Sequence, residues 1–126
     1  MRGIFLIVFF SLVLGLVNIT INPNKPILIN EMSFEETANE PFLLIDARST
    51  DDFELGHLQG ALNLSEENFD SQIGDLLDEW TPNMKIGVYC NPLKCGSSAK
   101  IARRLMKDYG IEKVFVLKGD WRKWEK

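Results

Sequence analysis

After position 30, apolar residues follow two patterns along the chain. They form short continuous runs, or they recur every three or four positions in longer segments. The continuous runs predict buried strands at 42–46, 60–64, 85–90 and 113–117. The periodic segments predict helices at 65–80 and 97–109, each with one apolar face. Strands that alternate with helices are typical of an α/β fold with a mostly parallel central sheet and helices on both faces.

Three further short helices are predicted within the segments 30–40, 50–58 and 120–126, the first two from their capping residues. The candidate N-caps are Asn30 or Ser33 in the first segment and Thr50 or Asp51 in the second. Gly56 is predicted to end the second segment, and Gly110 the helix at 97–109. In the helix at 65–80, the apolar face is predicted to consist of Phe69, Ile73, Leu76, Leu77 and Trp80.

Residues 1–21 differ from the rest of the chain, because Arg2 is their only charged residue and a long apolar run follows it. The run is longer than a signal-peptide core needs and shorter than a full membrane span. We expect an N-terminal hydrophobic helix here, either a cleaved signal or a membrane anchor, and both alternatives export the rest of the chain. Residues 22–30, with two prolines, are predicted to be a linker, and residues 31–126 to be the domain.

Composition narrows the range of functions. The 126 residues have room for one small domain with its own core. With 18 acidic and 14 basic residues, the chain has no electrostatic footprint for nucleic acid. Lys and Arg gather in the C-terminal third, either as solvated helix faces or as a field that attracts a small anion. One histidine and two cysteines do not make a zinc ligand set, so we expect neither a metal nor another cofactor.

Both cysteines, Cys90 and Cys95, lie in the stretch "VYCNPLKCGSS", where a predicted strand is followed by a predicted helix. In parallel α/β sheets, ligands bind beyond the carboxyl ends of the strands, and Cys90 lies at such an end. Backbone N–H groups and a helix N-terminus attract anions there. The candidate anion-binding loop consists of Asn91, Leu93, Lys94, Gly96, Ser97 and Ser98.

Several motifs resemble those of the rhodanese-like domain family. The segment "LLIDARSTDDFELGHLQGALNL" resembles the first signature of that family through Asp46, Arg48, Gly56, His57, Gly60, Ala61 and Asn63. The run "IGVYC" resembles the strand that carries the catalytic cysteine, and "VFVLKGDWRKW" is similar to the closing signature. The resemblance implies a three-layer sandwich from about residue 31 to the C-terminus. It gives Cys90 the catalytic role and makes Asp46, Arg48 and His57 parts of a structural signature.

Two positions depart from the pattern of that family. The family usually has an arginine five residues after the catalytic cysteine, where this chain has Cys95 and no arginine before Arg103. The loop is also about two residues longer when the helix patterns are aligned, which predicts a wider cradle. Asp120 stands where a second glycine is usual, and this difference concerns the terminal turn rather than the chemistry.

The resemblance implies a sulfurtransferase in which Cys90 takes sulfur from a small anionic donor and carries it as a persulfide to an unidentified acceptor. Cys95 has three open interpretations: a thiol that resolves the persulfide, a permanent disulfide partner, or a small residue in the place of the arginine. Two other functions also stay open. One is a thiol–disulfide or oxyanion reductase that uses Cys90 and Cys95, and the other is a non-catalytic binding module. We expect a location in the cell envelope or periplasm, soluble or held at the membrane by the N-terminal segment.

Overall fold

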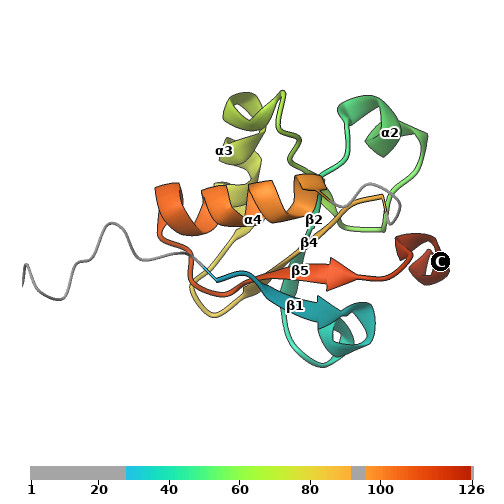
Figure 1. Ribbon diagram of the computed structural model, residues 1–126, viewed down its shortest axis with the longest axis horizontal. Coiled ribbons are helices and arrows are strands. Elements are labelled where there is room, and N and C mark those ends of the chain that lie inside the picture. The colour runs from blue at the N-terminus through green and yellow to red at the C-terminus, as the bar shows by residue number, and fades with distance from the viewer. Residues whose placement is uncertain (1–27, 92–95, 126) are drawn as a thin grey trace, which may run out of the picture.

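The computed structural model describes residues 28–91 and 96–125, which form a five-stranded sheet in the order β1-β5-β4-β2-β3 (Figure 1). All its strand pairs are parallel, as the alternation of strands and helices predicted. The strands are β1 (Asn30–Ser33), β2 (Phe42–Asp46), β3 (Leu62–Asn63), β4 (Lys85–Tyr89) and β5 (Val114–Lys118). The predicted N-terminal helix at 1–21 and most of the predicted linker lie outside the described residues.

Different helices cover the two faces of the sheet. On one face, α3 (Phe69–Glu79) and α4 (Gly96–Tyr109) pack on the strands and form the main core. On the other face lie two 3₁₀ helices, η1 (Phe34–Asn39) and η2 (Trp121–Trp124), over a smaller cluster around Tyr89. Within residues 28–91 and 96–125, no helix is both long and apolar enough to cross a membrane.

The first strand corrects the prediction for residues 30–40. Residues 30–33 form β1 rather than the first turn of a helix, so Asn30 is not an N-cap. Ser33 does precede the helix, but its side chain makes no capping hydrogen bond, and the helix is 3₁₀. The strand is specified by its partner, because Asn30 pairs with Phe115 and Ser33 with Lys118. This long-range pairing overrides the local capping signals, since strand formation depends strongly on tertiary context.

The N-cap of helix α2 (Thr50–Leu55) lies one residue before the first of its two predicted caps. Ser49 is its N-cap and its Oγ accepts a hydrogen bond from the Asp52 N–H at 3.2 Å. Thr50, predicted as a cap, instead donates its hydroxyl to Asn63 Oδ1 at 2.9 Å. Gly56 ends the helix as predicted, with its N–H donating to the Phe53 carbonyl.

Removing the capping hydroxyl in Ser49→Ala is expected to lower the free energy of unfolding by about 1 kcal/mol, because the Asp52 N–H loses its partner. Ser33→Ala is the matched control: it also changes a serine just before a short helix, but one without a capping bond. Urea unfolding of both variants measures the difference. Equal losses would show that the Ser49 hydroxyl does not act as a cap.

The helix α3 follows its predicted apolar face with one exception. Phe69, Ile73 and Leu76 of α3 are buried as predicted, but Leu77 is 42% exposed, which corrects its assignment to the core. Successive helical residues point about 100° apart, so the buried stripe that contains Leu76 leaves Leu77 outside. At the end of α4, Gly110 adopts a φ of 65°, the left-handed conformation that closes many helices.

Candidate active site

Cys90 directly follows β4, on the face of the sheet that α4 covers. Its side chain is only 4% exposed and packs in the main core. The thiol donates a hydrogen bond to Ser98 Oγ at 3.4 Å, and the Asn91 carbonyl oxygen lies 3.5 Å from the same sulfur. Ser98 is fully buried in the first turn of α4. The thiol is therefore held between a strand end and the start of a helix.

This arrangement suits a group that changes charge during a reaction. A hydroxyl both donates and accepts, so Ser98 can accept from the Cys90 thiol or donate to a sulfur anion. The N–H groups at the start of a helix also interact favourably with negative charge. The site can thus hold Cys90 both as a thiol and as an anion, which a sulfur nucleophile requires.

The other predicted residues of the loop are only partly described. Asn91 is exposed after Cys90, Gly96 is exposed at the start of α4, and Ser97 is half-buried beside Ser98. Leu93, Lys94 and Cys95 lie outside the described residues. The role of Cys95 and the anion-binding role of the loop therefore stay predictions.

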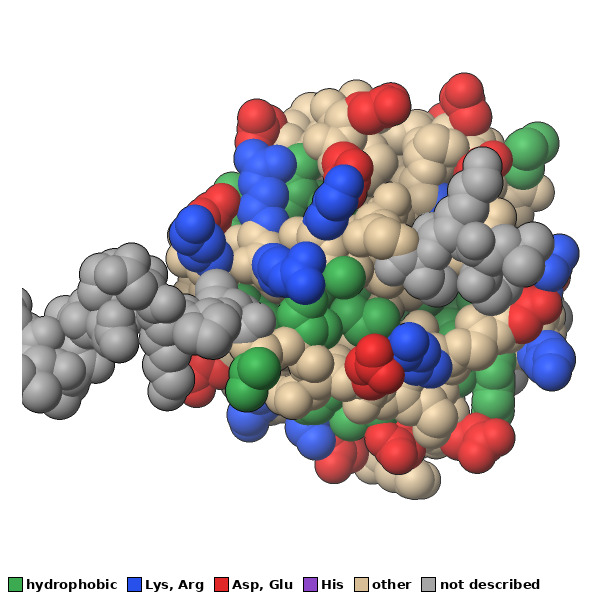
Figure 2. Space-filling model, in the orientation of Figure 1, with side chains coloured by type: hydrophobic (Ala, Val, Ile, Leu, Met, Phe, Trp, Pro, Cys, Tyr) green, Lys and Arg blue, Asp and Glu red, His purple; other side chains and the backbone are tan. Residues whose placement is uncertain are grey.

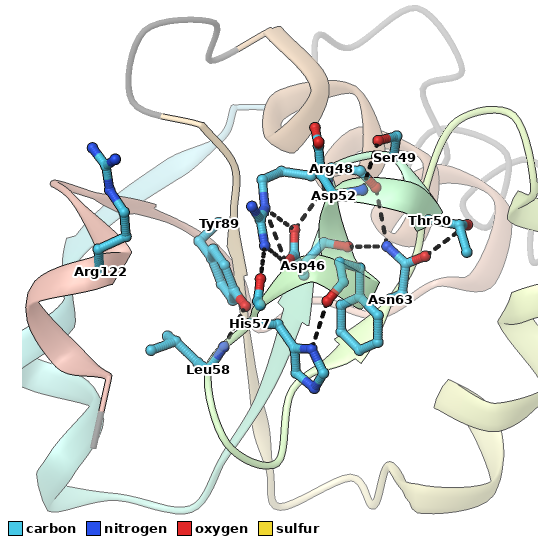
Figure 3. Close-up of polar contacts among 12 residues, drawn as sticks. Asp46, Arg48, Ser49, Thr50, Asp52, His57, Leu58, Asn63, Tyr89 and Arg122 are labelled. Atoms are coloured by element: carbon cyan, nitrogen blue, oxygen red, sulfur yellow. Dashed lines mark hydrogen bonds and ion pairs between the residues drawn. The ribbon is translucent and has the colours of Figure 1, made fainter.

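Asp46 and Arg48, expected as parts of a structural signature, form a largely buried ion pair at the end of β2 (Figure 3). The fully buried Asp46 carboxylate accepts the Arg48 backbone N–H at 2.9 Å, and Arg48 Nη2 lies 2.7 Å from Asp46 Oδ2. The same Nη2 donates to the Gly56 carbonyl at 2.6 Å. The guanidinium carbon lies 4.3 Å from the centre of the Trp121 ring. The pair therefore joins β2, the end of α2 and η2.

Electrostatics favour the charged form of this arginine. Burial by itself lowers the pKa of Arg48, but its hydrogen bonds and charge interaction with Asp46 outweigh burial and raise the pKa above the usual value. The sequence motif identified both partners. It did not reveal that Trp121 covers the guanidinium, because that contact depends on how η2 packs against the end of β2.

Tyr89 lies on the face of the sheet opposite Cys90, and His57 lies in the turn after α2. The buried Tyr89 hydroxyl accepts the Leu58 N–H at 3.1 Å, and burial, reinforced by the Asp46 charge, raises the pKa of that hydroxyl well above its ordinary value. His57 is exposed, stacks on Phe53 at 3.7 Å between ring centres, and donates from Nδ1 to the Phe53 carbonyl at 2.7 Å (Figure 3). Both contacts of His57 lie within the turn that ends α2.

Asn63, the last residue of the first signature, holds the loop after β2. Its Nδ2 donates to the carbonyl oxygens of Asp46 and Arg48, each at 3.0 Å. Its Oδ1 accepts from Gln72 at 2.7 Å, and Gln72 also accepts from the Ser65 N–H at 2.8 Å. Gln72 was not recognisable from the sequence, since a polar residue on an amphipathic helix carries no signal for this contact.

A second aspartate–arginine pair lies at the start of η2 and repeats the spacing of the first. Arg122 Nε and Nη2 each lie 3.0 Å from the carboxylate oxygens of Asp120, and Asp120 also accepts the Arg122 backbone N–H. These hydrogen bonds lower the pKa of Asp120. Asp120, which departs from the usual glycine, is thus the N-cap of η2. Unlike Arg48, the arginine of this pair is largely in solvent.

Metal ligands do not cluster in the part of the chain that the structure describes: residues 28–91 and 96–125 contain no group of three or more His, Cys, Asp or Glu side chains able to hold an ion. The chemistry that these residues can offer is that of a sulfur nucleophile beside a buried hydroxyl and a helix N-terminus. The buried ion pair and the asparagine network support the loops around it.

Comparisons with known proteins agree with this arrangement. The model of the rhodanese-like domain family matches residues 30–126. The uncharacterized protein YqhL of Bacillus subtilis (strain 168) is 32% identical over 82 residues, 64% of this chain and 59% of that protein. A Bacillus halodurans structure aligns with a TM-score of 0.57 at 19% identity, covering 75% of this chain and 70% of the other. The structure of a single-domain sulfurtransferase of Saccharomyces cerevisiae aligns with a TM-score of 0.56 at 17% identity, covering 79% of this chain and 91% of the other.

Proposed function

Because the chain belongs to the rhodanese-like domain family, we propose that it is a sulfurtransferase that carries sulfur as a persulfide on Cys90. The observation that carries the proposal is the buried thiol at the end of β4, hydrogen-bonded to Ser98 in the first turn of α4. The similar fold of a yeast single-domain sulfurtransferase supports the same reaction class.

The proposed reaction has two steps and is balanced without a cofactor. In the first, the Cys90 thiolate attacks the outer sulfur of thiosulfate, the S–S bond breaks, and sulfite leaves with the bonding electrons. In the second, an acceptor nucleophile attacks the outer sulfur of the persulfide and Cys90 leaves as a thiolate. Ser98 and the N-terminal N–H groups of α4 would stabilise the negative charge in both steps.

The proposal also includes the predictions for the loop after Cys90, for Cys95 and for residues 1–21. The loop from Asn91 to Ser98 would bind the anionic donor. Cys95 would resolve a persulfide that meets no acceptor: its thiolate attacks Cys90 Sγ, a Cys90–Cys95 disulfide forms, and the outer sulfur leaves as hydrosulfide. Residues 1–21 would direct the protein out of the cytoplasm, as a cleaved signal or a membrane anchor. In such an oxidising compartment, a reductant would have to keep Cys90 reduced for turnover.

The deciding experiment is the intact mass of the full-length protein, reduced, desalted without air and exposed to thiosulfate. We expect a gain of one sulfur atom. Because a resolving Cys95 would turn the persulfide into a disulfide, Cys95→Ser is measured beside the wild type. A loss of two hydrogens in the wild type, with no sulfur gained by Cys95→Ser, would overturn the proposal in favour of a Cys90–Cys95 dithiol reductase. No change in mass, with the protein folded by circular dichroism, would favour a binding module.

Ser98→Ala is expected to slow sulfur loading about tenfold, because the sulfur anion loses a hydrogen-bond donor. The final amount of persulfide should not change, since Cys90 remains. Ser71→Ala is the matched control, because Ser71 is likewise the third residue of its helix, α3, but it is exposed and its hydroxyl donates to the Asn68 carbonyl. The rate of mass gain from thiosulfate measures both variants. Equal rates in the two variants would show that the Ser98 hydroxyl does not assist Cys90.

A further inference from the structure

A groove of about 180 Å³ lies between α4 and the edge of the sheet formed by β1 and β5. In Figure 2, apolar side chains are exposed in this region. Basic side chains lie above them, over α4, and an acidic side chain lies beside a basic one below them. The groove is lined by Ile29, Glu31, Ala99, Arg103, Val116 and Lys118. Its apolar floor and charged rim fit a small ligand that is part aliphatic and part ionic.

Both walls of the groove contain residues that neighbour Cys90 or its partner Ser98. On the sheet side, Val116 pairs with Val88 in register, so Lys118 and Cys90 each follow two residues later on neighbouring strands. Side chains two residues apart along a strand point to the same face, which places Lys118 on the face of Cys90. On the helix side, Ala99 directly follows Ser98, whose hydroxyl contacts the Cys90 sulfur.

The groove carries a net positive charge. Lys118 Nζ lies 3.2 Å from Glu31 Oε1, so these two charges compensate each other. Arg103 lines the same groove one helical turn after Ala99, and it forms no ion pair with any residue in the described ranges. Its neighbour Arg104, in contrast, pairs with Asp70 and Asp108. Arg103 is thus available to an anionic ligand.

We propose that Arg103 and Lys118 form a binding site for the carboxylate of a small aliphatic thiol, which takes the sulfur from Cys90. The inference rests on the proposed sulfurtransferase function. The methylene chain of the thiol would lie on Ala99 and Val116, and its carboxylate would meet Arg103. This places the cation that recognises the substrate on α4, one turn beyond the loop, in a chain without the usual loop arginine.

The transfer that this site supports is balanced. The thiolate of the acceptor attacks the outer sulfur of the Cys90 persulfide, and a new S–S bond forms. The bond between that sulfur and Cys90 Sγ breaks, and its electron pair returns to Cys90 as a thiolate. The product is the persulfide of the acceptor, and no external oxidant or reductant takes part.

The kinetic test compares three acceptor thiols with full-length persulfidated protein: 3-mercaptopropionate, the neutral 3-mercaptopropanol and the cationic cysteamine. Arg103→Gln is expected to lower kcat/KM about fivefold with 3-mercaptopropionate alone, because an exposed charge pair contributes modestly. For each thiol, the kcat/KM of the variant is divided by that of the wild type, so the intrinsic reactivity of the thiol cancels. Lys107→Gln, an exposed cation on the same helix, is the matched control and should change none of the ratios.

Glu31→Gln provides a prediction of opposite sign. It removes the carboxylate that competes for Lys118, so kcat/KM with 3-mercaptopropionate should rise about twofold. Equal effects of Arg103→Gln on all three thiols, or equal effects of Arg103→Gln and Lys107→Gln, would overturn the assignment of this groove.

A binding measurement separates failure of this inference from failure of the proposed function. Propionate, which has no sulfur, is titrated into the ¹⁵N-labelled protein while amide chemical shifts are followed. We expect saturable shifts at Ala99 and Val116 that disappear in Arg103→Gln, whether or not Cys90 accepts sulfur. Shifts that are absent, or that persist unchanged in Arg103→Gln, would overturn the carboxylate site even if the protein transfers sulfur.

Discussion

Replacing Cys90 by serine is expected to abolish sulfur loading from thiosulfate, reducing it to the level of a sample without donor. A hydroxyl at this position has no sulfur with which to form a persulfide, and it is a far weaker nucleophile at neutral pH than a thiolate. The replacement keeps a small polar side chain that can still hydrogen-bond Ser98. Cys90→Ser should therefore remain folded, and intact mass after exposure to thiosulfate measures the loss.

Cys95→Ser is the control for this experiment, because it removes the other cysteine of the chain. If Cys95 resolves the persulfide, its removal should leave loading intact or increase the amount of persulfide that accumulates. Sulfur that loads onto Cys90→Ser but not onto Cys95→Ser would transfer the carrier role to Cys95 and contradict the proposed mechanism. Circular dichroism of both variants confirms that the fold is intact.

Arg48→Ala is expected to lower the free energy of unfolding by about 3 kcal/mol, the largest stability effect we predict. The replacement leaves the fully buried Asp46 carboxylate without its partner, and breaking a buried ion pair costs far more than losing an exposed one. It also removes the cation above Trp121 and the hydrogen bond to Gly56. Urea unfolding followed by tryptophan fluorescence measures the change.

The chain contains its own control for this prediction. Arg122 pairs with Asp120 at the same two-residue spacing and with matching hydrogen bonds, but the Arg122 side chain is 64% exposed whereas that of Arg48 is 12% exposed. Arg122→Ala should therefore cost less than about 1 kcal/mol. Similar losses in the two variants would show that burial does not decide the contribution of the Asp46–Arg48 pair.

The strands that the sequence predicted well are those whose apolar residues are continuous. Residues 42–46 and 85–89 lie in the middle of the sheet and are covered on both faces, so both neighbouring layers select apolar side chains. The edge strand β1 has the sequence "NEMS" and half-buried or exposed side chains. Its strand character comes from pairing with β5, which lies more than 80 residues away, and no local pattern encodes that partner.

The candidate site was likewise predictable only where it depends on local sequence patterns. Cys90 lies at a strand end and Ser98 on the following helix, and both assignments required only local patterns and the family resemblance. Two features depend on how distant elements pack. They are the contact between Trp121 and the Arg48 guanidinium, and the groove lined by Arg103 and Lys118. An exposed arginine on an amphipathic helix has the same sequence pattern whether it faces solvent or a binding groove.

Because the strands are parallel, the start of the described chain and the Cys90 thiol lie at opposite ends of the sheet. The described chain enters at Leu28, just before the amino end of β1, whereas Cys90 lies beyond the carboxyl end of β4. A strand of five residues is roughly 16 Å long, so the sheet itself is a rigid spacer between the two ends. If residues 1–27 attach the domain to a surface, substrates approach Cys90 from the side that faces away from that surface.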